Sequence, residues 1–476
     1  MTGGLAYEGL SNAGQSEEPL LVILNDNGMS ITQNVGGIAW YLARQRVKPQ
    51  YLRFKKAYRK ILSILPGGAY LHRFNHKFKQ AIKEAVLSCT MFEDMGFTYL
   101  GPVDGHDVAG VTRLLRWAKD LNTPVLLHVR TIKGKGCSYA QANPNAYHGV
   151  APFDPATGLP QSPPKPTFSK VMGETLCELA KRDSRICAIT AAMQTGCGLD
   201  EFAKRYPSRF FDVGIAEGHA ATMSGGMAKQ GLIPVFAVYS TFLQRAYDML
   251  LHDIALGNLH VVLAVDRAGL VGEDGETHQG IFDVAYLSSI PNMTVLCPSN
   301  FAELRRMVCK AVLNLSGPVA VRYPRGGEGA FTKDSGDDPS VLLRTGENIT
   351  LVGYGVLINH LLQAADALSN AGVEADVVKL NVIAPLDASL VERSVRKTGR
   401  LLALEDCVEN GSVGQRLAAK LISSGVSVKG LTLQNLGSQF IPHGKVSELQ
   451  NLYGLSGESV TRAALALCGK KGGPEP

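Results

Sequence analysis

The sequence has few of the features that mark several common classes of protein. Its nine cysteines include no Cys-x-x-Cys pair and their number is odd, so we expect neither a zinc site nor a disulfide framework. No apolar run approaches the ~18 residues of a membrane-spanning helix. The net charge of +6 is small for 476 residues and does not indicate binding to nucleic acid. Reduced thiols in a cytoplasmic protein are therefore expected.

What is present is the composition of an ordinary globular protein, with 45% hydrophobic and 19% charged residues. The length favours two or three domains. Three regions repeat one order: a short apolar run, a polar or glycine-rich turn, then a helical pattern. This alternation predicts an α/β fold with parallel sheets covered by helices on both faces. The expected strands include residues 19–27, 123–136, 185–190, 209–217, 232–240, 259–266, 317–326 and 348–355.

Ligands of such sheets bind at the carboxyl ends of the strands, which directs attention to the polar residues there. These are Asn25–Asn27, Glu217, Tyr239–Arg245, Asp266–Arg267 and Arg325. Asn27 could bind Mg²⁺ through oxygen, although Asn and Asp are also common turn formers. Glu217 could hydrogen-bond a heterocycle nitrogen, or it could only satisfy free N–H groups at a helix start.

Basic side chains also lie near expected strand ends. Arg245 follows one strand, while Arg322 and Arg325 end another, so two guanidinium groups could clamp a phosphate. The alternative is that they form separate structural ion pairs. In the loop 266–280, His278 near Asp274 could transfer protons at neutral pH. The segment 44–60 holds eight basic residues and no acids, which we interpret as a solvated or mobile segment near a phosphorylated substrate.

Seven segments together resemble one family. LNDNGMSI, GPVDGHD, IAEGHA, YSTFLQRAYD, DRAGLVGEDGETHQG, AVRYPRG and FIPHG are similar to 1-deoxy-D-xylulose-5-phosphate synthases, in this order, from residue 1 to about 470. STFLQRAYD followed by THQG separates this family from transketolases, which share its fold. The resemblance implies three doubly wound parallel-sheet α/β domains of transketolase type, the first of them truncated. We expect the end of a diphosphate-binding domain over 1–153, a linker over 154–166, a pyrimidine-binding domain over 167–330 and a C-terminal domain over 345–476.

The resemblance also implies the chemistry. Family members are homodimeric transferases that use thiamine diphosphate and Mg²⁺ to condense pyruvate with D-glyceraldehyde 3-phosphate, releasing CO₂. The product feeds isoprenoid, thiamine and pyridoxal biosynthesis. No nucleic acid or membrane takes part, and the expected location is cytoplasmic, with a plastid not excluded.

The family's site residues fall on matching positions of this sequence. Glu217 matches the glutamate that binds the aminopyrimidine ring, and Phe242 matches the aromatic residue that stacks on it. Asn27 matches the Mg²⁺ and diphosphate ligand, and Ile31 the residue that bends the cofactor. Arg245 and Arg325 match the arginines that hold the phosphate of the aldehyde. The residues expected to handle substrate oxygens and protons are His148, Tyr239, Arg267, Asp274 and His278.

The sequence departs from the family at several places. Cys137 stands where a tyrosine near the cofactor is common, and Gly28 and Gly218 replace a commoner Glu and Gln. The sequence has no Gly-Asp-Gly, whose Asp binds the metal in such enzymes and which should precede Asn27 by about 25 to 30 residues, upstream of Met1. We therefore expect these 476 residues alone to be inactive and to bind the cofactor weakly. A catalytically inactive homologue that acts by partner binding, or a transketolase-like enzyme, are the alternatives.

Overall fold

A computed structural model describes residues 3–29, 36–37, 41, 90–150, 152–163 and 165–470. The basic segment 44–60 and Ile31 therefore lie outside the described residues. The chain forms two compact units, one made mainly of residues 1–162 and the other mainly of residues 163–476. No helix in the described ranges is long and apolar enough to cross a membrane.

The first unit contains a three-stranded parallel sheet of order β1-β3-β2. The central strand β3 is buried on both faces because its side chains alternate between two cores. Leu126 packs with Leu10 and Phe92 on one face, whereas Leu127 packs with Ala118 on the other. The elements are α1 (Gly4–Gln15), β1 (Leu21–Asp26), α6 (Thr90–Asp94), β2 (Thr98–Asp104), α7 (Val108–Lys119), β3 (Val125–Arg130) and α8 (Ser138–Ala142).

The second unit begins with a region built on a seven-stranded sheet of order β13-β8-β9-β7-β6-β4-β5. Strands β4 to β9 pair in parallel, and every residue of β4, β6 and β7 is buried. The elements are α9 (Phe168–Arg182), β4 (Ile186–Thr190), α10 (Asp200–Arg205), β5 (Phe210–Asp212), α11 (Glu217–Lys229), β6 (Ile233–Tyr239), α12 (Ser240–Leu243), α13 (Tyr247–Met249), β7 (Val262–Asp266), α14 (Asp283–Ser289), β8 (Thr294–Leu296), α15 (Phe301–Leu313) and β9 (Val319–Arg322).

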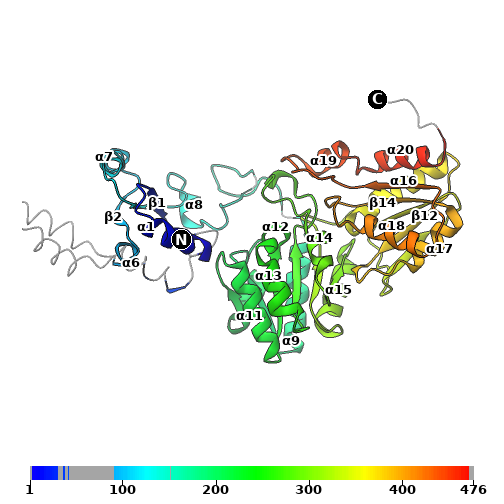
Figure 1. Cartoon of the computed structure of the whole chain (residues 1–476), viewed down its shortest axis with the longest axis horizontal. Coiled ribbons are helices and arrows are strands. Elements are labelled where there is room, and N and C mark those ends of the chain that lie inside the picture. The colour runs from blue at the N-terminus through cyan, green and yellow to red at the C-terminus, as the bar shows by residue number, and fades with distance from the viewer. Residues whose placement is uncertain are drawn as a thin grey trace, which may run out of the picture. The chain divides into compact units, whose positions relative to one another are not determined.

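The C-terminal region of this unit has a five-stranded sheet of order β10-β12-β11-β14-β15, parallel except at β10. Figure 1 shows α16 and α20 on one side of this sheet and α17 and α18 on the other. The elements are β10 (Ser340–Arg344), β11 (Ile349–Tyr354), α16 (Ile358–Asn370), β12 (Ala375–Leu380), β13 (Val382–Ala384), α17 (Ser389–Thr398), β14 (Arg400–Leu404), α18 (Val413–Ser423), β15 (Gly430–Gln434), α19 (Val446–Leu452) and α20 (Gly457–Leu467). The expected α/β fold is confirmed, with β10 and β13 as antiparallel edge strands.

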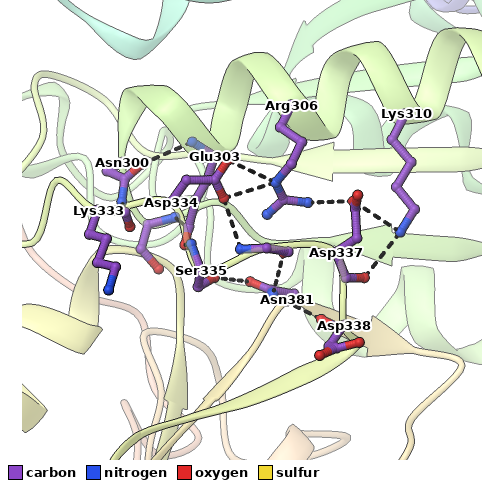
Figure 2. A network of polar contacts seen from close by, with 12 residues as sticks. Asn300, Glu303, Arg306, Lys310, Lys333, Asp334, Ser335, Asp337, Asp338 and Asn381 are labelled. Atoms are coloured by element: carbon purple, nitrogen blue, oxygen red, sulfur yellow. Dashed lines mark hydrogen bonds and ion pairs between the residues drawn. The ribbon is translucent and has the colours of Figure 1, made fainter.

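A buried polar network joins the two regions of the second unit. Strand β13 adds an antiparallel edge to the first region's sheet, and Lys379 on β12 lies 3.1 Å from Glu303 on α15. Both of these side chains are 0% exposed. Figure 2 shows Glu303 facing Ser335, whose hydroxyl donates to Oε1 at 2.6 Å. Asn300 caps α15 by accepting from the Glu303 N–H at 2.9 Å.

Arg306 extends the network towards the polar segment that connects the two regions. It contacts Asp334 at 2.9 Å and Asp337 at 2.8 Å, and Figure 2 shows both carboxylates on that segment. The polar stretch 326–340 is thus held against α15 by charge-assisted hydrogen bonds. The two regions belong to one compact unit.

Candidate active site

The strand ends of the seven-stranded sheet gather the candidate residues of the second unit. Tyr239 at the end of β6 pairs in register with Asp266 at the end of β7, and β7 pairs with β9 on its other side. Because these strands are parallel, their carboxyl ends meet at one edge of the sheet. The segment that starts at Ser240, the loop 266–280 and the residues after β9 all leave from this edge.

Glu217 is the first residue of α11, and its side chain is only 4% exposed. Its Oε2 lies 2.9 Å from Nη1 of Arg245, which is 44% exposed. Burial raises the pKa of Glu217, while the backbone hydrogen bond at the helix start and the charge of Arg245 oppose that rise. A buried carboxyl group whose proton is held more firmly than usual is suited to share a hydrogen with a ring nitrogen.

Aromatic rings form a wall next to the loop 266–280. Tyr239 and Phe242 stack with centroids 5.7 Å apart, and Phe242 meets His278 edge-on at 5.4 Å. The guanidinium group of Arg267 lies over the Tyr239 ring, 4.0 Å from its centroid. Burial raises the pKa of Tyr239, so its hydroxyl stays protonated at physiological pH. This wall offers a flat face beside a titratable imidazole.

Asp274 holds two of the predicted arginines. Its Oδ1 lies 3.3 Å from Nη1 of Arg325, and its Oδ2 forms an ion pair with Arg267. Arg325 also donates to the carbonyl of Val271 at 3.1 Å. Arg325 is 37% exposed, so an incoming phosphate could replace the carboxylate at its open side.

Arg322 forms structural ion pairs, which is the alternative to phosphate binding that the sequence leaves open for these arginines. Arg322 is buried and paired with Asp283 at 2.9 Å and with Asp406 at 3.0 Å. Two carboxylates already satisfy its charge in the core. Arg322 is the last residue of β9 and is buried, whereas Arg325, three residues further on, is partly exposed to solvent.

The backbone of the loop 266–280 is held at several points. Gly269 and Gly280 exchange two backbone hydrogen bonds, of 2.7 and 2.8 Å. Thr241 donates from its hydroxyl to the carbonyl of Thr277 at 3.0 Å. Asp266, fully buried, accepts from the N–H of Arg267 at 2.7 Å, and Arg267 has a left-handed backbone with φ of 56°.

Two residues of this loop were given no role from the sequence. The strand-end rule pointed to Asp266, but its burial raises its pKa to about 7, which no sequence pattern indicates. Gln279 lies inside THQG, beside the predicted His278. Its amide contacts a segment 163 residues away, so only the folded structure reveals its place.

The remaining predicted residues belong to the first unit. Oδ1 of Asn27 accepts from the N–H of Met29 at 2.9 Å, which is the turn-forming arrangement that the sequence left open. Cys137 is a free, partly buried thiol directly before α8. His148 is largely exposed. The partial shielding of its ring from water, and then the positive charge of Lys133, lower its pKa.

The neighbours of Asn27 are engaged within the fold. Oδ2 of Asp26 lies 3.1 Å from Nε2 of the buried His128, and Asn25 accepts from the Thr131 hydroxyl at 2.6 Å. Within the described ranges, no group of three or more His, Cys, Asp or Glu could hold a metal ion. Asn27 supplies one neutral oxygen, so the described residues do not by themselves form a Mg²⁺ site.

The fold and the site define a transketolase-type α/β protein. The family models that match are "1-deoxy-D-xylulose-5-phosphate synthase" over residues 1–131, "Transketolase, pyrimidine binding domain" over 164–327 and "Transketolase, C-terminal domain" over 340–460. A solved structure described as a split-gene transketolase, an inactive β4 tetramer, matches 64% of this chain and 99% of its own with a TM-score of 0.57 and 28% identity. A transketolase from Campylobacter jejuni has the same fold, with a TM-score of 0.53 over 97% of this chain and 75% of its own at 18% identity.

Curated relatives identify the family more closely. The 1-deoxy-D-xylulose-5-phosphate synthase of Desulforudis audaxviator is 44% identical over 470 residues, which cover 98% of this chain and 74% of that protein. The synthase of the same name from Pelotomaculum thermopropionicum is 45% identical over 471 residues, with the same shares. The chain belongs to the 1-deoxy-D-xylulose-5-phosphate synthase family.

Proposed function

We propose that this chain carries the carboligation site of a 1-deoxy-D-xylulose-5-phosphate synthase. The reaction joins pyruvate to D-glyceraldehyde 3-phosphate, releases CO₂ and supplies a precursor of isoprenoids and of thiamine. The observation that carries the proposal is the buried Glu217 at the start of α11, paired with Arg245 at 2.9 Å. Family membership gives this pair its chemical context.

Thiamine diphosphate, when bound, supplies the electron sink that decarboxylation of a 2-oxo acid needs. Glu217 would hold a hydrogen against the aminopyrimidine ring, because its burial favours the protonated carboxyl group. Phe242 would stack on that ring, with Tyr239 supporting it from behind. The diphosphate end would require Asn27 together with Mg²⁺, in the partly buried turn after β1.

The acceptor aldehyde carries a phosphate, and Arg245 and Arg325 are the partly exposed cations proposed to bind it. Each now contacts a carboxylate, Glu217 or Asp274, so phosphate binding exchanges one anion for another. Arg267, Tyr239 and His278 would hold the oxygens of the substrates, and His278 would move protons between them. Asp274 would orient Arg267 and Arg325 from one side. The resemblance also assigns roles in the reaction to His148, Cys137 and Ile31, and it implies a homodimer.

Product analysis tests the proposal. A chimera in which a relative's segment bearing Gly-Asp-Gly precedes Met1 would receive Mg²⁺, thiamine diphosphate, [1-¹³C]pyruvate and glyceraldehyde 3-phosphate. We expect one ¹³CO₂ for each deoxypentulose phosphate formed. Transfer of a two-carbon ketol unit from xylulose 5-phosphate, without use of pyruvate, would instead identify a transketolase.

A second candidate is a non-catalytic homologue that acts by binding partners, and it is favoured by the neutral side chain of Asn27, whose Oδ1 already accepts from the N–H of Met29. Calorimetric titration of the 476 residues alone with Mg²⁺ and thiamine diphosphate separates the two roles of the chain. We expect at least tenfold weaker binding than by the chimera, because loss of metal-site partners costs about 10–100-fold or more in affinity. Equal micromolar binding by both proteins would refute the view that Asn27 alone is too weak a metal ligand.

A further inference from the structure

Backbone hydrogen bonds between Gly269 and Gly280 join the two ends of the loop 266–280, and the loop packs against the C-terminal region. Gly269 has φ of 76°, and a Cβ atom there would overlap the carboxylate of Asp406. The N–H of Gly444 also approaches the carbonyl of Gly272 at 3.4 Å. The loop that carries Arg267, Asp274 and His278 therefore rests on residues of another sheet's region.

The side chain of Gln279 makes a further contact between these two regions. It is 3% exposed, and each end of its amide has one partner. Oε1 accepts from the N–H of Val271 across the loop at 2.9 Å, and Nε2 donates to the carbonyl of Pro442 at 3.1 Å. A buried amide with both ends satisfied has one favourable orientation, because rotation would leave two buried groups unpaired.

Val271 connects Gln279 to Arg325 in the proposed phosphate site. Its N–H is held by Gln279, and its carbonyl accepts from Nη1 of Arg325 at 3.1 Å. The carbonyl of Pro442, the amide of Gln279, the backbone of Val271 and the guanidinium group of Arg325 thus form one continuous series of hydrogen bonds. A shift of the Pro442 segment would move Arg325 through this series.

We propose that Gln279 is a positioning residue through which the C-terminal region fixes the loop 266–280 and the guanidinium group of Arg325. The consequence for phosphate binding rests on the proposed function, whereas the fixing of the loop does not. The C-terminal region would then act on the reaction without contributing a group that touches the substrate. Segment FIPHG would be the part of that region that makes this contact.

The variant Gln279→Glu tests the proposal because it keeps the shape of the side chain but removes its donor. At pH 8 the ionised carboxylate would face the carbonyl of Pro442 and repel it. At pH 5 a protonated carboxyl group can donate to the same carbonyl and restore the contact. Other titratable side chains lie in or near the loop, namely Asp266, Asp274, His278 and His443, and burial raises the pKa of Asp266 to about 7, so each measurement is compared with the parent protein at the same pH.

Hydrogen exchange followed by mass spectrometry gives the first measurement, on the 476-residue chain without cofactor. We expect Gln279→Glu to lower protection of residues 266–280 at least fivefold at pH 8 and to return it to within twofold of the parent at pH 5. Gln434→Glu is the matched control, because its Nε2 donates to the carbonyl of Gly454 at 3.0 Å, away from this loop. Unchanged protection at pH 8, or an equal loss at both pH values, would overturn the proposal.

The second measurement is the binding of glycerol 3-phosphate, followed by calorimetry. We expect Gln279→Glu to weaken it about tenfold at pH 8 but not at pH 5, and Arg325→Ala to weaken it at both. If the parent protein does not bind this phosphate ester, the proposed phosphate role of Arg325 fails, and the exchange result alone decides the role of Gln279. If the loop loosens while binding is unchanged, the link from Gln279 to Arg325 is wrong.

Discussion

Arg245 donates to the buried carboxyl group of Glu217 across 2.9 Å, so two residues to which the sequence assigns separate roles are one ion pair. Glu217 is expected to act on the cofactor ring and Arg245 on the phosphate of the aldehyde. Under these proposed roles, binding of the phosphate would draw Arg245 away from Glu217. Since Arg245 lowers the pKa of Glu217, its departure would let Glu217 hold its proton more firmly.

Removal of either proposed phosphate-binding arginine should affect one substrate more than the other. In the chimera, Arg245→Ala or Arg325→Ala should raise KM for glyceraldehyde 3-phosphate about ten- to hundredfold, because a charge-assisted contact is worth ~1.5–3 kcal/mol. KM for pyruvate should change much less. Steady-state kinetics with both substrates measures the difference, and equal effects on the two KM values would count against a phosphate clamp.

Non-phosphorylated glyceraldehyde provides the control for this prediction. It should be a poor acceptor for the parent protein, and its KM should change little with either substitution. Arg322→Ala should differ from Arg245→Ala and Arg325→Ala in its effect. Arg322 is buried between Asp283 and Asp406, so its removal would leave both carboxylates without this cation. That variant should lose stability and should not alter KM for one substrate selectively.

Asp266 should make stability depend on pH near neutrality. Burial raises the pKa of Asp266 to about 7 from an ordinary 3.8. Its contribution to the free energy of unfolding is therefore full below about pH 4 and is lost as the pH rises through 7. Between pH 5 and 8 the parent should lose on the order of 3 kcal/mol of unfolding free energy relative to Asp266→Asn. Urea denaturation across this range measures the loss.

The control for Asp266 is Asp183, a partly exposed carboxylate whose pKa is lowered, chiefly by its hydrogen bond with Arg185. The contribution of Asp183 to the free energy of unfolding is present above the ordinary pKa of 3.8 and is lost only as the pH falls below that value. Asp183→Asn should therefore show no change relative to the parent between pH 5 and 8. A flat difference for Asp266→Asn as well would show that the buried carboxyl group does not titrate in this range.

The buried pair of Lys379 and Glu303 should matter more for stability than surface pairs do. Lys379→Met leaves the carboxylate of Glu303 buried without its cation and should cost about 3–5 kcal/mol of unfolding free energy. Arg205→Met, which breaks an exposed pair with Glu201, should cost less than about 1 kcal/mol. Adding Glu303→Gln to Lys379→Met should restore much of the loss. A cost for Lys379→Met as small as that for Arg205→Met would contradict the predicted role of this pair.

Local sequence patterns were enough to predict most of the strands near the site. The apolar runs 185–190, 232–240 and 348–355 contain β4, β6 and β11, because strands covered on both faces read as continuous apolar segments. The run 209–217 was predicted too long. Only Phe210–Asp212 form β5, and Glu217 already begins α11.

Contacts between distant parts of the chain could not be predicted in this way. Arg322 finds its carboxylates 39 and 84 residues away, and Gln279 finds the carbonyl of Pro442 163 residues away. Neither partner leaves a periodic signal in the sequence, since the contacts depend on how two sheets pack. The same argument explains why Arg322 and Arg325, three residues apart, have different surroundings.

The rate at which Glu217→Gln forms 1-deoxy-D-xylulose 5-phosphate, relative to the parent chimera, tests the central claim most directly. The amide keeps the shape of the side chain but cannot share a proton with the ring in the same way, and such proton transfer contributes about 10²–10⁴-fold to rates. We predict at least a hundredfold loss with an unchanged circular dichroism spectrum. Turnover within tenfold of the parent would show that Glu217 does not have the role assigned to it.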